Sequence, residues 1–189
     1  MSVKHALLAL LSEGPRYGYE LKAAFEARTG DAWPLNVGQV YTTLARLERD
    51  GHVERDSEDA EGHVHYRLTD AGRREAQAWW DGEVAREAPP RDELAIKLAL
   101  ALTVPGVDAR DVLQRQRTAT VRALQTHTRR RTALTAAQRD ATTAPGTGST
   151  AAVLVVESLI FAAEAEVRWL DHCEARLVRA ATASNGARR

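Results

Sequence analysis

The sequence predicts a mainly helical fold that contains one small β-hairpin. Ala supplies much of an apolar content of 44%, and aromatic residues make up only 5%, a composition that favours helices because Ala and Leu lose little on entering one. Apolar residues recur at helical spacing over much of the 189-residue chain. Between residues 52 and 68 the period changes from 3.6 to 2, which indicates two strands.

The first helices are separated by clear breakers. An apolar-periodic helix starts near Val3 and ends before Gly14-Pro15, and a second one covers residues 19–28 with Gly30 at its carboxyl end. A third helix is expected over 36–50, where Asn36 can cap the amino-terminal N–H groups.

Two strands follow, over residues 52–55 and 63–68, joined by the polar turn 56–62. Alternation places Val64, Tyr66 and Leu68 inward and the residues between them outward. Thr69-Asp70 then opens another helix, and Pro89-Pro90 closes this part of the chain. We therefore expect one domain over residues 1–88 and a second over 89–189.

The second domain is expected to consist of helices alone. A short helix over 92–102 precedes a long one that Asp108 caps and that runs to about Arg139. A connector at 144–149 leads to a last helix over about 150–181, whose apolar residues alternate at spacings of 4 and 3 like a coiled-coil seam. The seam residues are Val156, Ile160, Ala163, Val167, Leu170 and Leu177.

Composition and charge exclude several classes of protein. No run approaches the ~20 apolar residues that span a bilayer, and the single Cys173 rules out an internal disulfide framework. We therefore expect a cytoplasmic protein without a membrane segment. The net charge is zero, but residues 1–90 hold 11 Lys and Arg against 16 Asp and Glu. Any contact of this half with nucleic acid must therefore depend on where its individual basic residues lie.

Three helices and a hairpin in under 70 residues is the order of a winged helix-turn-helix, in which the third helix can enter a DNA major groove. Three motifs are more specific than this order of elements: GPRYGYEL at 14–21, GQVYTTLARLERDG at 38–51 and YRLTDAGR at 66–73. In order, they resemble the signature, recognition helix and strand-to-helix junction of the PadR-like transcriptional regulators, over about residues 5–85. Many members have Pro where Thr42 stands, and the turn here is unusually acidic.

Polar residues of the third helix are the candidates for reading bases. Gln pairs with adenine, Thr contacts thymine, and Arg pairs with guanine or phosphate. An ordinary solvated helix face is the alternative, and the family resemblance favours DNA contact. The candidates on and before this helix are Asn36, Gln39, Thr42, Thr43, Arg46 and Arg49.

Other residues are expected to contact phosphates. The resemblance implies this role for Tyr19, Lys22 and Tyr41, with core packing as the alternative for either tyrosine. On the wing, the candidates are Arg55, His63, His65 and Arg67, but four acidic residues at the tip would be repelled by phosphate.

The resemblance to longer family members also implies a homodimer, paired through the helical domain and suited to a pseudo-palindromic operator. The seam described above is the predicted interface. Trp79, Trp80 and Trp169 form the candidate surface for a small aromatic effector, because flat aromatics stack on Trp; packing between the two domains is the alternative.

We expect no cofactor, no metal and no enzymatic activity. No catalytic motif is present. A metal site of His52, His63 and His65 is the alternative use of these residues, but no Cys lies nearby and the pair His63 and His65 has no evident carboxylate partner. Cys173 on the seam is interpreted as a small buried hydrophobe.

The resulting hypothesis is a homodimeric, ligand-responsive repressor that occludes a promoter, with a transporter, efflux or stress gene as its target. An effector would change the angle between the two winged helices and misalign one half-site. The alternative is an interaction module that dimerises but does not bind DNA specifically, which the acidic first half would suit.

Overall fold

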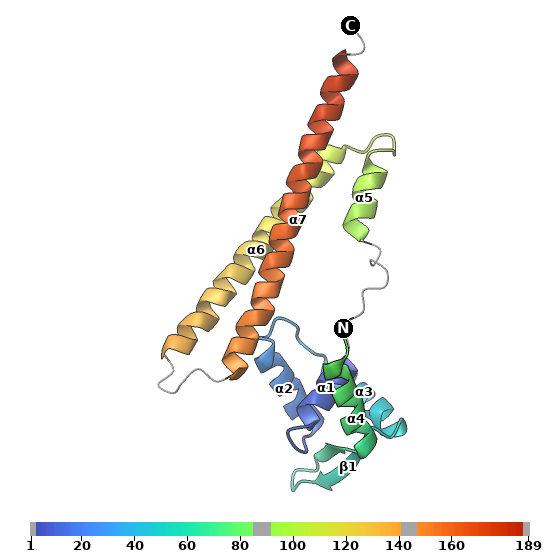
Figure 1. Ribbon diagram of the computed structural model, residues 1–189, viewed down its shortest axis with the longest axis vertical. Coiled ribbons are helices and arrows are strands. Elements are labelled where there is room, and N and C mark those ends of the chain that lie inside the picture. Colours follow the sequence, from blue (N-terminus) through green and yellow to red (C-terminus); the bar gives the residue numbers. More distant parts are fainter. Residues whose placement is uncertain (1–2, 85–91, 141–146, 187–189) are drawn as a thin grey trace. The chain divides into compact units, whose positions relative to one another are not determined.

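The computed structural model describes residues 3–84, 92–140 and 147–186. They divide into two compact units, one of residues 1–85 and 143–153 and the other of 86–142 and 154–189. Helices make up most of both units, and a single two-stranded sheet is found in the described parts of the chain (Figure 1). The predicted fold class is confirmed.

The first unit is built on three helices whose leucines share one core. They are α1 (Val3–Leu11), α2 (Gly18–Arg28) and α3 (Val37–Arg49). Leu7, Leu21 and Leu44 are fully buried at their meeting point. Each fully buried side chain of this kind stabilises the fold by about 1.5–3 kcal/mol relative to exposure, so this cluster fixes how the three helices pack.

The wing is an antiparallel hairpin of β1 (Val53–Glu58) and β2 (Val64–Leu68). Val53 pairs with Leu68 at its base, and the register shifts between Arg55 and Ser57, so that Asp56 is an extra residue on β1. The strand is longer than predicted, because Ser57 and Glu58 pair with β2 although they are polar. Backbone pairing tolerates exposed charged side chains at the solvent face of an antiparallel sheet.

Helix α4 (Asp70–Asp81) follows directly after β2 and packs back on α1 and the hairpin. The Thr69 side chain caps it by accepting from Gly72 N at 3.1 Å. A Cβ at Gly72 would lie 1.9 Å from the His52 carbonyl oxygen. The first turn of α4 can therefore approach the chain before β1 only because residue 72 has no side chain.

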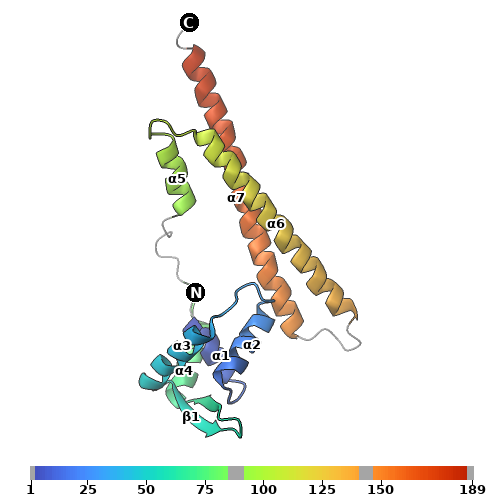
Figure 2. The same cartoon turned by 180° about the vertical axis from the view of Figure 1, so that it is seen from behind.

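The second unit contains α5 (Glu93–Ala101), α6 (Ala109–Asp140) and most of α7 (Thr147–Gly186), from residue 154 onward. Asp92 caps α5, and the Asp108 side chain accepts from the first N–H groups of α6, as predicted. The long helices α6 and α7 run antiparallel and side by side in both views (Figures 1 and 2). Helix α7 begins at Thr147, within the stretch predicted as a connector.

Polar bonds and one apolar cluster join α6 to α7. Gln116 donates to Glu166 at 2.9 Å, and the buried Thr120 hydroxyl donates to the same carboxylate at 2.5 Å. Leu113 and Leu170 are almost fully buried and pack with Leu98 of α5. The three helices therefore form a packed unit within one chain.

Gly72→Ala tests the close approach of α4 to the chain before β1. The alanine Cβ and the His52 carbonyl are both fixed directly by the backbone, so neither can move aside. Overpacking of this kind costs about 1–3 kcal/mol or more. We expect a loss at or above the upper end of that range in urea unfolding. Gly148→Ala is the matched control, because nothing lies within 4 Å of its Cβ position on α7. Equal unfolding midpoints for wild type and Gly72→Ala would contradict the packing described.

Candidate nucleic-acid interface

Helix α3 presents one polar face because its other face is buried. Val40, Leu44 and Leu47 are at most 2% exposed, and the helical period then determines which residues point outward. The outward residues include most of those that the sequence predicts for base contact. Gln39, Thr42, Arg46 and Arg49 are exposed, and Thr43 is half-buried.

The two threonines use their hydroxyl protons within the helix. Thr42 donates to the Gly38 carbonyl at 2.8 Å, and Thr43 donates to the Gln39 carbonyl at 2.7 Å. The hydroxyl oxygens can still accept, and the methyl groups remain available for contact with a thymine methyl. Both side chains thus have a fixed orientation and keep groups suited to a base edge.

The two arginines of α3 differ in their charge environment. Arg49 Nε lies 2.8 Å from Asp50 Oδ1, and this pair raises the pKa of Arg49 and lowers the pKa of Asp50. No ion pair to Arg46 is found among the described residues. Arg46 can therefore offer its guanidinium to a ligand without first giving up a carboxylate.

Asn36 caps α3, as predicted. Its side-chain oxygen accepts from Gly38 N at 2.7 Å, which satisfies one of the amino-terminal N–H groups of the helix. The amide oxygen is therefore in use for structure, and only the amide nitrogen remains for a contact with DNA.

The candidates for phosphate contact on α2 and α3 are of two kinds. Tyr19 and Tyr41 are 59% and 43% exposed, so neither is a core residue. Lys22 is paired with Glu26 at 2.7 Å, an interaction that lowers the pKa of Glu26. The tyrosine hydroxyls can donate to an anion directly, whereas the Lys22 charge is largely compensated.

Tyr41 is positioned by a close approach of α2 and α3. A Cβ at Gly18 would lie 2.6 Å from Tyr41 Cζ, so the ring occupies the space that a side chain at residue 18 would need. The glycine of the GPRYGYEL motif thus accommodates the tyrosine of the motif at 38–51. These two motifs, separate in the sequence, form one structural contact.

The cationic residues of the wing are paired with carboxylates. Arg55 Nε lies 3.0 Å from Glu48 Oε1. Arg67 contacts both Glu54 and Asp56, each at 3.0 Å. The two arginine side chains are 49–64% exposed, so solvent screens these pairs and either arginine can exchange its carboxylate for a phosphate at modest cost. Sequence reasoning predicted the acidic tip but not these pairs.

The wing tip gathers two histidines around one carboxylate. Asp59 Oδ2 lies 2.9 Å from His63 Nδ1 and 3.4 Å from His65 Nε2. Asp59 Oδ1 accepts from the backbone N–H groups of Glu61 and His63. The bond from His63 N, followed by those from the two imidazoles, lowers the pKa of Asp59 to about 2. The premise that these histidines have no carboxylate partner is therefore wrong.

His52 lies outside that group of side chains. Its Nδ1 is buried and has no hydrogen-bond partner among the described residues. Of the three histidines weighed as a metal site, only His63 and His65 come together. The sequence could have identified Asp59 as a partner of His63, because it lies four residues earlier, at the other end of a short hairpin loop.

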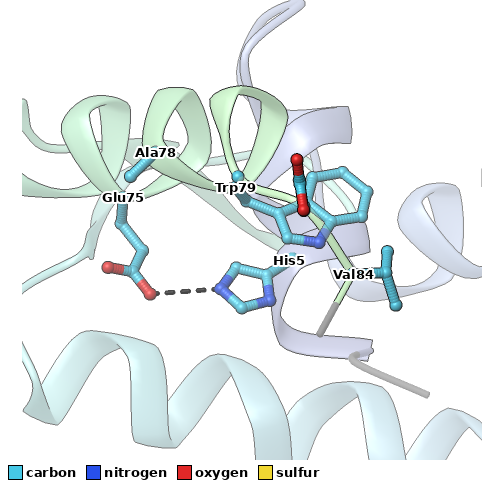
Figure 3. Close-up of a pocket in the computed structure, with 7 residues that line it drawn as sticks. His5, Glu75, Ala78, Trp79 and Val84 are labelled. Carbon is cyan, nitrogen blue, oxygen red and sulfur yellow. Dashed lines mark hydrogen bonds and ion pairs between the residues drawn. The ribbon is translucent and has the colours of Figure 1, made fainter. Parts of the chain in front are cut away.

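Trp79 and Trp80 lie at the end of α4, where Trp79 lines a hollow of about 390 Å³ and Trp80 is 63% exposed. The Trp79 indole lies parallel to the His5 imidazole, with 5.6 Å between ring centroids, and His5 Nε2 contacts Glu75 at 3.1 Å (Figure 3). His5 and Lys4 lower the pKa of Glu75. Because Glu75 and Glu83 both line this hollow, it suits a neutral or cationic ring better than an anion.

Trp169 lines a separate pocket of about 450 Å³ within the helical unit. Side chains from α5, α6 and α7 form its walls, and Arg176 is its one cationic residue among those described. The remaining lining is mostly apolar and includes Leu98, Leu113, Cys173 and Leu177. Of the three tryptophans proposed as one aromatic surface, Trp79 and Trp169 thus line two hollows of different charge, and Trp80 lines neither of them.

The seam of α7 is largely buried inside a single chain. Leu170 packs with α5 and α6, and Leu177 packs against the same cluster. At Leu170 and Leu177 the helix packs on α5 and α6 of its own chain, and the seam as a contact between two copies stays a prediction. The four buried seam residues are Val156, Ile160, Ala163 and Leu170.

Two family models match successive parts of the chain. Residues 7–78 match the transcriptional regulator PadR-like family, and residues 90–178 match the virulence activator alpha C-term. The negative transcriptional regulator PadR of Bacillus subtilis is 25% identical over 117 residues, or 60% of this chain. The match spans 64% of that relative's length.

Solved structures share the fold over nearly the whole chain. The Vibrio cholerae virulence activator AphA superposes with a TM-score of 0.71 at 23% identity, over 94% of this chain and 99% of AphA. Bacillus subtilis PadR in complex with operator DNA gives 0.67 at 21% identity, over 93% and 99% of the two chains. The same protein in complex with p-coumaric acid gives 0.63 at 22% identity, over 92% and 97%.

The winged helix and the matched residues 7–78 are those of a transcriptional regulator of PadR type. Residues 7–78 thus match the PadR-like domain of transcriptional regulators, and the virulence activator alpha C-term follows it over residues 90–178. None of the helices in the described ranges is long and apolar enough to cross a membrane.

Proposed function

We propose that this protein is a homodimeric repressor that reads DNA with α3. The observation that carries the proposal is the polar face of that helix, set against a fully buried apolar stripe. Gln39, Thr42 and Arg46 place an amide, a methyl with a hydroxyl, and an unpaired guanidinium on one rigid surface. These groups recognise adenine, thymine and guanine in the major groove. The operator complex of Bacillus subtilis PadR supports this reading through its shared fold.

Contacts to phosphate would come from the exposed tyrosines and from the paired cations. Tyr19 and Tyr41 flank the base-reading face and can donate hydrogen bonds, which position the protein without reading sequence. Lys22, Arg55 and Arg67 would exchange their carboxylates for phosphates. Each exchange leaves a carboxylate behind, so these residues add less to affinity than Arg46 does.

Dimerisation would use apolar side chains that the single chain leaves exposed. Phe161 and Leu154 are 68% and 62% exposed, and they lie seven residues apart on one face of α7. Ile96 and Leu100, four residues apart on α5, are 47% and 54% exposed. Contact between two copies would bury these side chains and present two copies of α3 to a pseudo-palindromic operator.

Repression would follow from occlusion of a promoter, in the cytoplasm where that DNA is found. The negative regulator PadR of Bacillus subtilis supports this sign of regulation. A transporter, efflux or stress gene is the target that we propose.

The Trp169 pocket is the site that we propose for an effector. It combines an indole, apolar walls and the Arg176 guanidinium, which together suit a flat aromatic carboxylate. The complex of Bacillus subtilis PadR with p-coumaric acid supports this class of ligand. Trp79 and Trp80, beside two glutamates, would take part only for an uncharged or cationic ring.

Arg46→Ala tests base reading by α3. We expect it to weaken binding to duplex DNA from upstream of the gene by about 5- to 150-fold, because a good base contact contributes about 1–3 kcal/mol. Fluorescence anisotropy at two salt concentrations, with a scrambled duplex alongside, measures both affinity and selectivity. Arg74→Ala, which removes an exposed arginine of α4, is the control. Equal, feeble binding to both duplexes would instead favour an interaction module that does not read DNA.

Phe161→Glu tests the dimer. A carboxylate at the centre of an apolar interface is costly to bury, so we expect the dimer to dissociate at least tenfold more readily. Size-exclusion chromatography with light scattering, over a range of concentrations, reports the mass. Gln125→Glu on an exposed part of α6 controls for the change of charge. A dimer that persists unchanged in Phe161→Glu would show that this face is not the interface.

Calorimetric titration with p-coumaric acid tests the effector pocket. Arg176→Gln removes the charge partner and Trp169→Leu removes the indole, and we expect each to weaken binding about tenfold or more. Trp79→Phe should bind as the wild type does. Thermal unfolding shows whether each variant is folded. If Trp79→Phe is the variant that loses binding, the effector site lies at α4 instead.

A further inference from the structure

The tip of the wing carries a group of metal-ligating side chains that DNA reading does not use. Asp59 Oδ2 lies 2.9 Å from His63 Nδ1 and 3.4 Å from His65 Nε2. Asp59, Glu61 and His63 can each offer one ligand atom, and these atoms all lie within 4.8 Å of one another. We propose that these two imidazoles and two carboxylates bind one transition-metal ion, with Zn²⁺ as the natural occupant.

The hairpin explains why these residues meet. His63 and His65 are two residues apart where β2 begins, so their side chains leave the same face of the strand. Asp59 N donates to the His63 carbonyl at 3.1 Å and thereby places Asp59 opposite His63 at the end of the hairpin. Glu61 lies in the short loop between them. The ligands therefore come from seven consecutive residues whose backbone is already folded.

The donor set selects the class of metal. Imidazole nitrogen together with carboxylate oxygen suits Zn²⁺ and its neighbours Co²⁺ and Ni²⁺, whereas Mg²⁺ and Ca²⁺ prefer oxygen alone. Ligand bonds of about 2.0–2.2 Å around a tetrahedral ion place ligand atoms roughly 3.3–3.5 Å apart. The two separations at Asp59 are close to this range, and Glu61, whose ligand atom lies within 4.8 Å of those of Asp59 and His63, would rotate closer as an ion replaces the hydrogen-bonded contacts.

Neighbouring groups hold the ligands in position. Asp59 Oδ1 accepts from Glu61 N at 3.1 Å and from His63 N at 2.8 Å, which turns Oδ2 toward the imidazoles. The Tyr17 ring stacks on His63 with 4.5 Å between centroids and meets His65 at 5.4 Å. Contacts of this kind orient the ligands of metal sites and increase their affinity.

The ion would also change how the wing meets DNA, a consequence that rests on the proposed function. The tip holds four carboxylates, and phosphates repel them. A divalent ion adds two positive charges beside the same loop. We expect metal to strengthen binding to any duplex severalfold at fixed ionic strength, without changing the selectivity that α3 provides.

Titration of the tag-free, metal-free full chain with Zn²⁺, and with Co²⁺ as a spectroscopic probe, tests the site. We expect one ion per chain and visible Co²⁺ absorption typical of four ligands. Asp59→Asn, which keeps the acceptor for the loop N–H groups, and His65→Gln should each weaken binding at least tenfold. His172→Gln removes an exposed histidine of α7 and should bind normally. Thermal unfolding without metal shows that the variants are folded.

Two results would overturn the proposal. One is the absence of stoichiometric binding with up to about 100 µM metal. The other is binding that Asp59→Asn and His65→Gln leave unchanged. Anisotropy with a scrambled duplex then tests the effect of metal on DNA affinity separately from metal binding itself. If metal binds at the wing but leaves the affinity for DNA unchanged, the proposed effect of metal on DNA binding is refuted. If the protein selects no duplex, the proposed function is refuted, but the metal titration is unaffected.

Discussion

The burial of the apolar stripe of α3 is the constraint on which the rest of the first unit depends. Val40, Leu44 and Leu47 are held against the leucines of α1 and α2, so α3 cannot rotate about its axis without exposing them. That fixed rotation determines which polar side chains face solvent. It also sets the position of Tyr41 against Gly18 and the point from which the chain enters the wing. The polar face of α3 is held rigidly because the opposite face of the same helix is part of the hydrophobic core.

Most of the fold could be predicted from the sequence, because its elements are marked by local signals. Asn36, Thr69, Asp92 and Asp108 lie at the starts of helices, where their side chains satisfy free N–H groups. The predictions were least accurate where backbone pairing between strands, and not the polarity of the side chains, determines the structure. Residues 56–58 read as a polar turn but form the end of β1, since backbone hydrogen bonds to β2 do not depend on apolar side chains.

The candidate site was predicted in part, and the missing part consists of side-chain partners. Periodicity identifies Gln39, Thr42 and Arg46 as outward residues, because a helix has one period and one buried face. It contains no information on which carboxylate will pair with Arg55 or Arg67, since those contacts join residues across the hairpin or between elements. The same holds for the seam of α7. A repeat of apolar residues shows that a partner helix exists but not whether it belongs to the same chain.

The contact between Gly18 and Tyr41 has a consequence for how such sequences can diverge. The tyrosine ring fills the volume that a side chain at residue 18 would need, so a change at either position alters the space available to the other. A larger residue at 18 is compatible with this helix pair only if the ring at 41 shrinks or swings away. Among related proteins, these two positions are therefore expected to evolve as a linked pair, and the appearance of a side chain at the first would signal a different residue or ring position at the second.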